Sequence, residues 1–446
     1  MKNYKHQIVL TPRDVLYFRD GRPLGGAADG NGAQWPLPTV WHSAVLSAFH
    51  RNFSEVDLNR YAKNHKHPRT KPGNSTYKDK NFGGEARTLA KFGGVKTLGP
   101  FPQLKDEIYF PLPADLLPEE KDSATDLIPA QLLPCDPGTA GKSDLPLPLK
   151  YVLWKEVKPT KQDPGQWISQ EGLKLYIEGK IEAIKVGEHI KKNSDFFDTE
   201  ARPGIAINPE TGTTEDRKFY SAEYLRLKAS ANMVAFIDSV SVGREGNYDL
   251  WNEFCKNALR QPLIFGGQRG VIWSKTTTSG NDLVPTTRNS EEKKLLLKWT
   301  LLSPALFNAG WVPGFVNQTD GNVLLKSVPG KTPEESRIQW RERISKDAGS
   351  INAQLVAARI GKPVAVSGWK INSTKDLKAS GNDGSGAPKA TRLLVPAGSV
   401  YYFECASEDD AKKLYDSLHG KVKSDLLGEQ GYGLGVCSAW EFGNNL

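Results

Sequence analysis

Short apolar runs and apolar residues at helical spacing alternate along the second half of this chain. The strand candidates are apolar runs at residues 233–240, 271–273, 295–302, 399–405 and 436–442. The helix candidates are amphipathic stretches at 249–259 and 408–419. Short apolar runs are typical of buried strands, and apolar residues that repeat with the helical period are typical of helices. From about residue 230 the order is strand, helix, strand, intervening chain, strand, helix, strand, which predicts a βαββαβ unit of the ferredoxin-like type.

The first half opens in the same way and is then interrupted. A strand candidate at 7–10 precedes a glycine-rich loop at 24–33 and a helix that prolines introduce at 36–38. Thr39 is the expected cap of this helix, because its hydroxyl can accept a hydrogen bond from a free backbone N–H. Three interruptions follow: a polar, basic excursion at 51–80, a proline-dense region at 101–149, and a strand–turn–strand pattern at 195–220.

The sequence therefore predicts an α+β protein of two ferredoxin-like (RRM-like, βαββαβ) domains with long loop and β-hairpin insertions. We expect the N-terminal domain at residues 1–222, where the large insertions lie. We expect the C-terminal domain at 223–446, ending in a glycine-rich loop. A length of 446 residues favours two domains over a single core.

Three glycine-rich loops are the first candidates for binding. They contain Gly25 and Gly26, then Gly266 and Gly267 with Gln268, and near the end Gly431, Tyr432, Gly433 and Gly435. The last loop follows a helix and precedes a strand, which is the reverse of the nucleotide-binding order. Glycine lets bare backbone amides approach a phosphate closely, so these loops are expected to lie against a nucleic-acid backbone.

Charge supports an anionic partner without proving one. The chain has 59 basic and 51 acidic residues, a formal charge of +8 and a pI near 9.0. Its four cysteines lie far apart, which favours reduced thiols over disulfides or a zinc site. The N-terminus lacks the features of a signal peptide, and no apolar run is long enough to span a membrane. We therefore expect a cytoplasmic protein.

Catalytic, metal and cofactor sites find little support in the sequence. Residues 138–143 end like a phosphate-binding P-loop, but Asp136 stands where that motif needs glycine. His65 and His67 lack acids or cysteines at ligand spacing, so a solvated basic loop is the better interpretation. His42 and His50 could act as general acid and base, although a core or interface role is favoured. We expect neither a cofactor nor a bound metal ion.

Three arginines complete the set of candidates. Arg19, Arg22 and Arg269 flank or lie within the glycine-rich loops. Guanidinium groups bind phosphates through two parallel hydrogen bonds, which suits recognition of a nucleic-acid backbone. Residues of the same kind are equally expected in surface ion pairs, so the residues alone leave both interpretations open.

An ordered series of motifs resembles a known family. The motifs are FRDGRP at 18–23, PLPT at 36–39, GPF at 99–101, YFPLPAD at 109–115, ARPGIAI at 201–207, FGGQR at 265–269, SGW at 367–369, VPAGSV at 395–400 and the terminal glycine loop. In this order they resemble the RAMP-superfamily proteins of CRISPR effector complexes. More narrowly, the chain is similar to the third subunit of Cmr-type (type III-B) RNA-guided complexes. The helix at 39–50 and the excursion at 51–80 depart from that pattern.

The resemblance implies a non-catalytic antiviral subunit that binds the 5′ repeat-derived handle of the guide RNA. Its expected partners are that RNA, the large polymerase/cyclase-like subunit, and the adjacent backbone subunit of the filament. The residues predicted to contact RNA are Arg19, Arg22, Gly25, Gly26, His42, Gly266, Gly267, Gln268, Arg269, Gly431, Tyr432, Gly433 and Gly435.

Two alternatives stay open at this point. One is a metal-independent endoribonuclease that processes CRISPR repeat RNA with His42 and His50. The other is an assembly scaffold with minor RNA contact, which eleven tryptophans and long irregular loops would suit.

Overall fold

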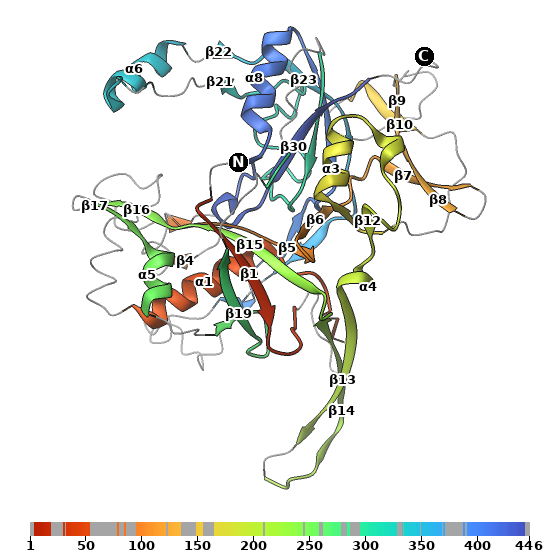
Figure 1. Cartoon of the computed structure of the whole chain (residues 1–446), viewed down its shortest axis with the longest axis vertical. Coiled ribbons are helices and arrows are strands. Elements are labelled where there is room, and N and C mark those ends of the chain that lie inside the picture. The colour runs from red at the N-terminus through yellow and green to blue at the C-terminus, as the bar shows by residue number, and fades with distance from the viewer. Residues whose placement is uncertain are drawn as a thin grey trace.

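Two antiparallel β-sheets with helices packed against them form the body of the protein (Figure 1). This computed structural model describes residues 4–18, 30–31, 33–53, 78–79, 84–85, 95–121, 124–134, 149–154, 165–207, 210–243, 246–257, 262–277, 283–285, 295–327, 332, 334–347, 349–367, 369–370, 387–388 and 390–441. Strands and helices are both present, and the strands are mainly antiparallel. The predicted α+β class is therefore confirmed.

The first sheet has eight strands. In spatial order they are β12 (Ile190–Lys191), β11 (Trp167–Ser169), β6 (Glu107–Pro111), β5 (Lys96–Leu104), β15 (Ala231–Asp238), β1 (His6–Pro12), β19 (Val271–Thr277) and β18 (Leu263–Ile264). Its four main strands lie in the order β5-β15-β1-β19, which is second, third, first and fourth along the chain. Each of these strands runs antiparallel to its neighbours.

Two helices cover one face of this sheet. Helix α1 (Pro38–Asn52) follows β1, and helix α5 (Leu250–Asn257) follows β15. The Trp41 and Trp251 rings of the two helices pack at a centroid distance of 5.9 Å, and both residues are fully buried. Aromatic pairs in this edge-to-face arrangement bury a large apolar area, so the two helices form one layer on the sheet.

The start of α1 differs from the prediction. Leu37 is the N-cap residue and makes no side-chain capping bond, and Pro38 occupies the first turn. Proline suits that position because its missing N–H would have no partner there anyway. Thr39 therefore does not cap the helix, and its hydroxyl is hydrogen-bonded to Tyr432 near the C-terminus at 2.8 Å.

Strand β15 shows why the first sheet is buried on both faces. Met233, Ala235 and Ile237 pack with the helices α1 and α5. The alternate residues Val234 and Phe236 pack on the opposite face, in a cluster that includes side chains of α3 (Gln170–Ile177) and of the second sheet. Successive strand residues point to opposite faces, so one continuous apolar run serves both layers.

The second sheet has five strands. In spatial order they are β23 (Ala353–Arg359), β28 (Val400–Cys405), β20 (Leu296–Leu301), β30 (Leu434–Ala439) and β29 (Lys421–Val422). The strands β23, β28, β20 and β30 are second, third, first and fourth along the chain, as in the first sheet, and all pairs are antiparallel. Helix α8 (Glu408–Leu418) packs on one face through Ala411, Leu414 and Leu418.

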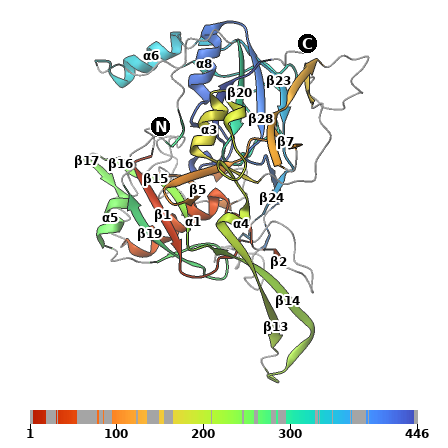
Figure 2. The same cartoon turned by 45° about the vertical axis from the view of Figure 1, so that its right-hand side comes forward.

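An irregular segment shares that face with α8. Phe307, Phe315 and Val323, which follow β20, belong to the same apolar cluster as the α8 side chains. The helix that comes next, α6 (Arg337–Asp347), extends away from the body in both views (Figures 1 and 2). A βαββαβ unit would place its first helix against the sheet here, so the helix pattern differs from the prediction.

The pairing of strands does not follow the predicted boundary between residues 222 and 223. Strands β15 and β19 lie beyond that boundary and pair with β1 on its two sides. The sequence predicted them as the start of the second βαββαβ unit. Their pairing instead depends on contacts between residues more than two hundred positions apart, which no local pattern reveals.

The remaining strands form small separate pairs. They are β13 (Phe197–Ile207) with β14 (Thr214–Leu227), to which β2 (Gly30–Asn31) adds, β7 (Leu116–Lys121) with β8 (Ala124–Pro129), β9 (Gln131–Pro134) with β10 (Tyr151–Trp154), β16 (Val240–Gly243) with β17 (Gly246–Asp249), β21 (Lys326–Ser327) with β22 (Gly349–Ser350), β24 (Val364–Val366) with β27 (Arg392–Leu394), β25 (Trp369–Lys370) with β26 (Ala387–Pro388), and β3 (Lys78–Asp79) with β4 (Gly84–Glu85). Short helices are α4 (Asn193–Phe196), η2 (Ile181–Ala183) and η3 (Gly428–Gln430). The β13–β14 hairpin projects far from the body (Figures 1 and 2).

A buried polar cluster covers the other face of the second sheet. The Lys298 Nζ of β20 lies 2.9 Å from the Asp115 Oδ2, and both residues are less than a tenth exposed. The Tyr176 hydroxyl of α3 donates to Asp115 at 2.8 Å, and the Tyr402 hydroxyl of β28 donates to it at 3.1 Å. This face is therefore closed by the chain itself and does not form an open platform.

Candidate nucleic-acid interface

The loop between β18 and β19 is an exposed turn on a buried base. Phe265 is fully buried, and its N–H donates to the Gly270 carbonyl at 2.8 Å, which closes the loop. Gly266 has a φ of +79°, and Gln268 and Arg269 both have a φ of +54°. Left-handed backbone costs an L-residue about 1–2 kcal/mol, so two such residues in a row mark a site where the loop shape matters. All four residues from Gly266 to Arg269 are exposed.

The segment that precedes Arg19 and the predicted glycine-rich loop at 24–33 lies directly against this turn. The Gly267 N–H donates to the Tyr17 carbonyl at 2.8 Å. The Phe18 and Phe265 rings pack edge to face at 5.6 Å. A Cβ at Gly266 would lie 2.7 Å from the Tyr17 carbonyl oxygen, so only glycine fits at this contact.

Two loops predicted separately, from residues about 250 positions apart, therefore start at one place. The structure positions Gly266, Gly267, Gln268 and Arg269 beside Tyr17 and Phe18. Arg19, Arg22, Gly25 and Gly26 lie outside the described residues. Tyr17 and Phe18 have a defined position beside the turn, Arg19 is the next residue along the chain, and Arg22 comes three residues later.

The base of the β13–β14 hairpin adds two more arginines to this surface. The Arg202 guanidinium lies over the Tyr224 ring at 5.2 Å, and Tyr224 packs on Tyr17 at the same centroid distance. Arg202 and Arg226 both pair with Glu200, and both also pair with Asp14 just after β1. The four charged side chains are exposed or half-exposed, so solvent screens these pairs strongly.

The Glu200 carboxylate, which both arginines share, decides the charge state of this cluster. Hydrogen bonds from Arg226 and Arg202 hold the pKa of the Glu200 carboxyl below its usual range. The cluster is therefore fully ionised near neutral pH, with two guanidinium groups at the surface between the hairpin and the β18–β19 loop. Guanidinium binds phosphate in the same forked geometry as carboxylate, so an RNA backbone could compete for these arginines.

The terminal glycine loop lies elsewhere and is buried. Tyr432 is fully buried, and Gly431, Gly433 and Gly435 are buried as well. A Cβ at Gly431 would lie 2.7 Å from the Thr97 carbonyl oxygen of the first sheet, and one at Gly435 would collide with the Trp299 indole. Gly431 thus lets this loop approach the first sheet, and Gly435 leaves room for Trp299 within the second sheet. The expectation that this loop lies against RNA is corrected accordingly.

His42 is also a buried residue. Its side chain is 4% exposed, and its Nδ1 lies 3.0 Å from the Thr97 hydroxyl. Burial lowers the pKa of this imidazole to about 4. A ring enclosed in this way is neutral near pH 7 and out of reach of RNA, so the geometry supports neither the predicted RNA contact nor a general base at this position.

Metal ligation and membrane insertion find no support among the described residues. In the described ranges no group of three or more His, Cys, Asp or Glu side chains is placed to hold a metal ion. None of the helices in that part of the chain is long and apolar enough to cross a membrane. Cys255, Cys405 and Cys437 are free thiols. The His65–His67 pair and the P-loop-like stretch at 138–143 lie outside the described residues.

Sequence reasoning missed several residues of this surface. Tyr17, Tyr224 and Arg226 belong to no glycine-rich loop, and Arg202 was noted only within the ARPGIAI motif. A useful signal was present for Arg202 and Tyr17, because each belongs to or adjoins one of the ordered motifs. Arg226 and Tyr224 are brought to this surface by the pairing of the hairpin strands. Asp198 is paired with Arg226, and Glu200 is paired with Tyr224.

Comparisons with known proteins identify the family. The model of the family described as CRISPR-associated protein (Cas_Cmr3) matches residues 8–440, nearly the whole chain. A search of curated proteins finds no match.

Solved structures show weaker likenesses. A chain of the type III-B Cmr-beta complex bound to cognate target RNA and AMPPnP is similar over 96% of this chain and 94% of its own, at 14% identity and a TM-score of 0.42. A chain of the Csm3–Csm4 subcomplex of the type III-A CRISPR-Cas interference complex is similar over 89% and 92%, at 10% identity and a TM-score of 0.38. These likenesses are too distant to add to the family match. On that match, the chain belongs to the CRISPR-associated Cas_Cmr3 family, as its ordered motifs predicted.

Proposed function

We propose that this protein is a non-catalytic, RNA-binding subunit of a type III-B CRISPR effector complex that acts in the cytoplasm. In this proposal it holds the 5′ repeat-derived handle of the guide RNA. Its partners are the large polymerase/cyclase-like subunit and the adjacent backbone subunit of the filament. Family membership supports the general role, and the geometry of the β18–β19 loop supports the RNA site.

One observation carries the RNA site. The exposed turn from Gly266 to Arg269 is hydrogen-bonded to Tyr17, the second residue before Arg19. The residues assigned to RNA are therefore Arg19, Arg22, Gly25, Gly26, Gly266, Gly267, Gln268 and Arg269, with Arg202 and Arg226 added from the hairpin. In this assignment backbone amides and guanidinium groups bind phosphates, which suits a single-stranded handle.

The closed face of the second sheet limits where RNA can bind. RRM-type proteins stack bases on aromatic side chains of an open sheet. On the sheet face opposite α8, the aromatic residue Tyr402 of β28 is 3% exposed and donates a hydrogen bond to Asp115. We therefore infer that RNA binds at the loop and hairpin surface of the first sheet. We also infer that both sheets derive from βαββαβ units, because both have the strand order second, third, first, fourth.

Arg269→Ala tests the site. We expect handle RNA to bind about 1–3 kcal/mol more weakly and the salt slope of log K to fall by about one, since one phosphate contact is lost. Binding is measured by fluorescence anisotropy with a single-stranded handle oligonucleotide at several salt concentrations. Arg341→Ala is the control, because Arg341 is an exposed arginine on the projecting helix α6. Equal binding by wild type and Arg269→Ala at every salt concentration would refute the site.

The absence of catalysis is tested separately. Incubation of the purified protein with repeat RNA in the presence of a chelator should leave the RNA uncut. A discrete cut that is lost in His50→Ala would establish the endoribonuclease alternative instead, with His50 as one of its catalytic groups.

A further inference from the structure

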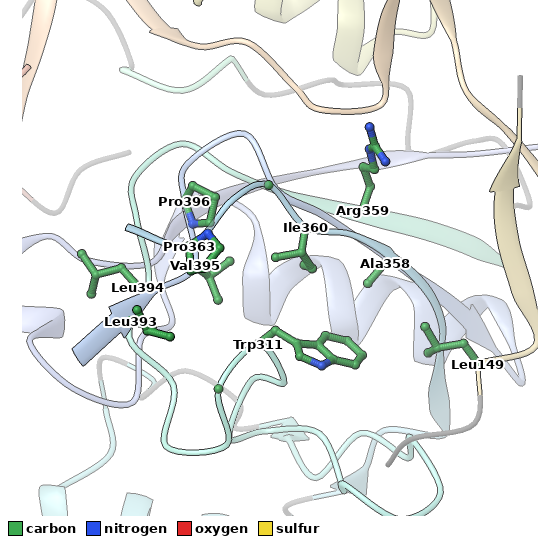
Figure 3. Close-up of a pocket in the computed structure, with 12 residues that line it drawn as sticks. Leu149, Trp311, Ala358, Arg359, Ile360, Pro363, Leu393, Leu394, Val395 and Pro396 are labelled. Atoms are coloured by element: carbon green, nitrogen blue, oxygen red, sulfur yellow. The ribbon is translucent and has the colours of Figure 1, made fainter. Parts of the chain in front are cut away.

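An apolar pocket opens beside the end of strand β23, far from the nucleic-acid interface in sequence. Its volume is about 530 Å³, and the Trp311 indole forms one wall (Figure 3). Ala358 and Ile360, on the same side of the strand, face the indole, and Leu393 lies across from them (Figure 3). The lining residues are Leu149, Gly310, Trp311, Ala358, Arg359, Ile360, Gly361, Pro363, Leu393, Leu394, Val395 and Pro396. A space of this size and polarity fits one or two large apolar side chains.

The charge beside the pocket is positive. Arg359 points away from the cavity, to the other face of the strand (Figure 3), and is exposed. No ion pair involving Arg359 is found among the described residues, and none of the twelve lining residues is acidic. A group that binds along this strand therefore meets an apolar pocket on one face and a guanidinium on the other.

The backbone of β23 is open next to the pocket. This strand lies at the edge of the second sheet, and β28 is its one neighbour among the described strands of that sheet. On its outer side, hydrogen bonds from residues 321–323 reach Ala353 and Leu355, in the first half of the strand. No described strand is hydrogen-bonded to the outer side from Ala357 to Arg359, although Tyr151 and Leu153 of β10 pack in one apolar cluster with Val356 and Ala357. A strand end without a paired neighbour offers backbone groups to an added strand.

We propose that the pocket and the open half of β23 form a docking site for an extended segment of a partner protein, in which an apolar side chain is flanked by acidic residues. Side chains alternate along an added strand, so one would enter the pocket while its neighbours lie beside Arg359. A carboxylate on each side of the apolar residue is the charge complement of that arginine. The site is separate from the RNA surface and does not depend on it.

A nucleotide is the competing ligand, because Trp311 could stack on a base. The lining argues against it, since the walls other than the Trp311 indole are aliphatic and Arg359 points away from that ring (Figure 3). None of the twelve lining residues then points a cation at a phosphate in the cavity. A peptide uses both faces of the strand and the free backbone groups, so it accounts for all three features.

The test uses the full-length protein with ¹⁵N label and follows the Trp311 indole resonance, assigned with Trp311→Phe. The probes are the peptides Ac-Glu-Asp-Leu-Asp-Glu-NH2 and Ac-Lys-Lys-Leu-Lys-Lys-NH2, and adenosine monophosphate. We expect a saturable shift with the acidic peptide and roughly tenfold weaker binding of the basic one. Arg359→Glu should reverse that preference.

Two further variants separate docking from a change in fold. Leu393→Glu places a charge in the pocket and should abolish the shift, whereas Leu324→Glu should bind like wild type. Leu393 and Leu324 are both 58% exposed, so the two substitutions are matched in burial. Equal responses to both peptides, a response to adenosine monophosphate alone, or no response to any probe would overturn the proposal.

Discussion

Burial decides what each polar side chain can do in this protein. His42 was a candidate for RNA chemistry because histidine titrates near neutral pH. In the structure it is 4% exposed between α1 and the first sheet, and its pKa is lowered to about 4 by burial. Arg269, which the sequence could not distinguish from a surface ion-pair partner, is exposed in a strained turn. Two residues predicted to contact RNA thus differ in what they can do, because one is enclosed and the other is exposed.

His42 makes stability depend on pH. Its pKa in the unfolded chain is near 6.5 and in the folded protein about 4, so the unfolded state binds the extra proton between these values. The contribution to stability is complete above pH 6.5, and it falls by about 3 kcal/mol as the pH drops to 4. We expect His42→Gln to lack this loss. Urea denaturation of both proteins from pH 7 to pH 4 measures it, and a pH-independent difference between them would contradict it.

Among the elements, the β18–β19 loop has a shape that requires glycine at position 266. Local turn rules predict the loop but not this requirement. The sequence marked FGGQRG as a loop, because glycine clusters are typical of turns. The sequence could not show that Gly266 lies against the Tyr17 carbonyl, because the two residues are about 250 positions apart. The predicted strand–turn–strand at 195–220 is likewise found as the β13–β14 hairpin, but its projection away from the body is a tertiary property.

Gly266→Ala should damage this loop in a specific way. Its φ of +79° strains an alanine, and the added Cβ would lie 2.7 Å from backbone oxygen that cannot move aside. Gly179→Ala is the matched control, with a φ of +77° and nothing within 4 Å of its Cβ. We expect Gly266→Ala to lose about 1–3 kcal/mol more stability than the control and to bind handle RNA more weakly. Equal losses in the two variants would show that the contact is unimportant.

In the whole molecule, two buried contacts join the second sheet to the rest of the body. The terminal glycine loop packs on β5, where Gly431 meets Thr97 and Leu98. The Asp115 carboxylate binds Lys298 of the second sheet, and burial together with the charge of Asp115 raises the pKa of the Tyr176 and Tyr402 hydroxyls. Both contacts exclude water between the sheets, so we expect the body to unfold in one cooperative transition.

Removal of one partner of the buried ion pair tests that coupling. Asp115→Ala leaves the Lys298 ammonium buried without its carboxylate, and should cost about 3–5 kcal/mol of unfolding free energy. The double variant with Lys298→Met should recover much of the loss, because no unpaired charge remains. Asp106→Ala, at an exposed turn, is the control and should be nearly neutral. Guanidinium denaturation followed by far-UV circular dichroism measures the free energy of unfolding of the wild type and the three variants. An Asp115→Ala variant as stable as the wild type would rule out the coupling.

Several local elements and the family could be predicted from the sequence alone. The helices α5 and α8, the strands β20, β28 and β30, and the β13–β14 hairpin were predictable because apolar period and turn chemistry act over a few residues. The ordered motifs placed the chain in its family, as the match over residues 8–440 confirms.

Which strands share a sheet and which loops face solvent depends on contacts between distant parts of the chain. Strands β15 and β19 pair with β1 although more than two hundred residues separate them, because register is set by burial on both sheet faces. Of two glycine loops with similar composition, the one at Gly266 is exposed and the one at Gly431 is enclosed between the sheets. Glycine permits close approach to a ligand and to the protein's own backbone alike, and only packing selects between them.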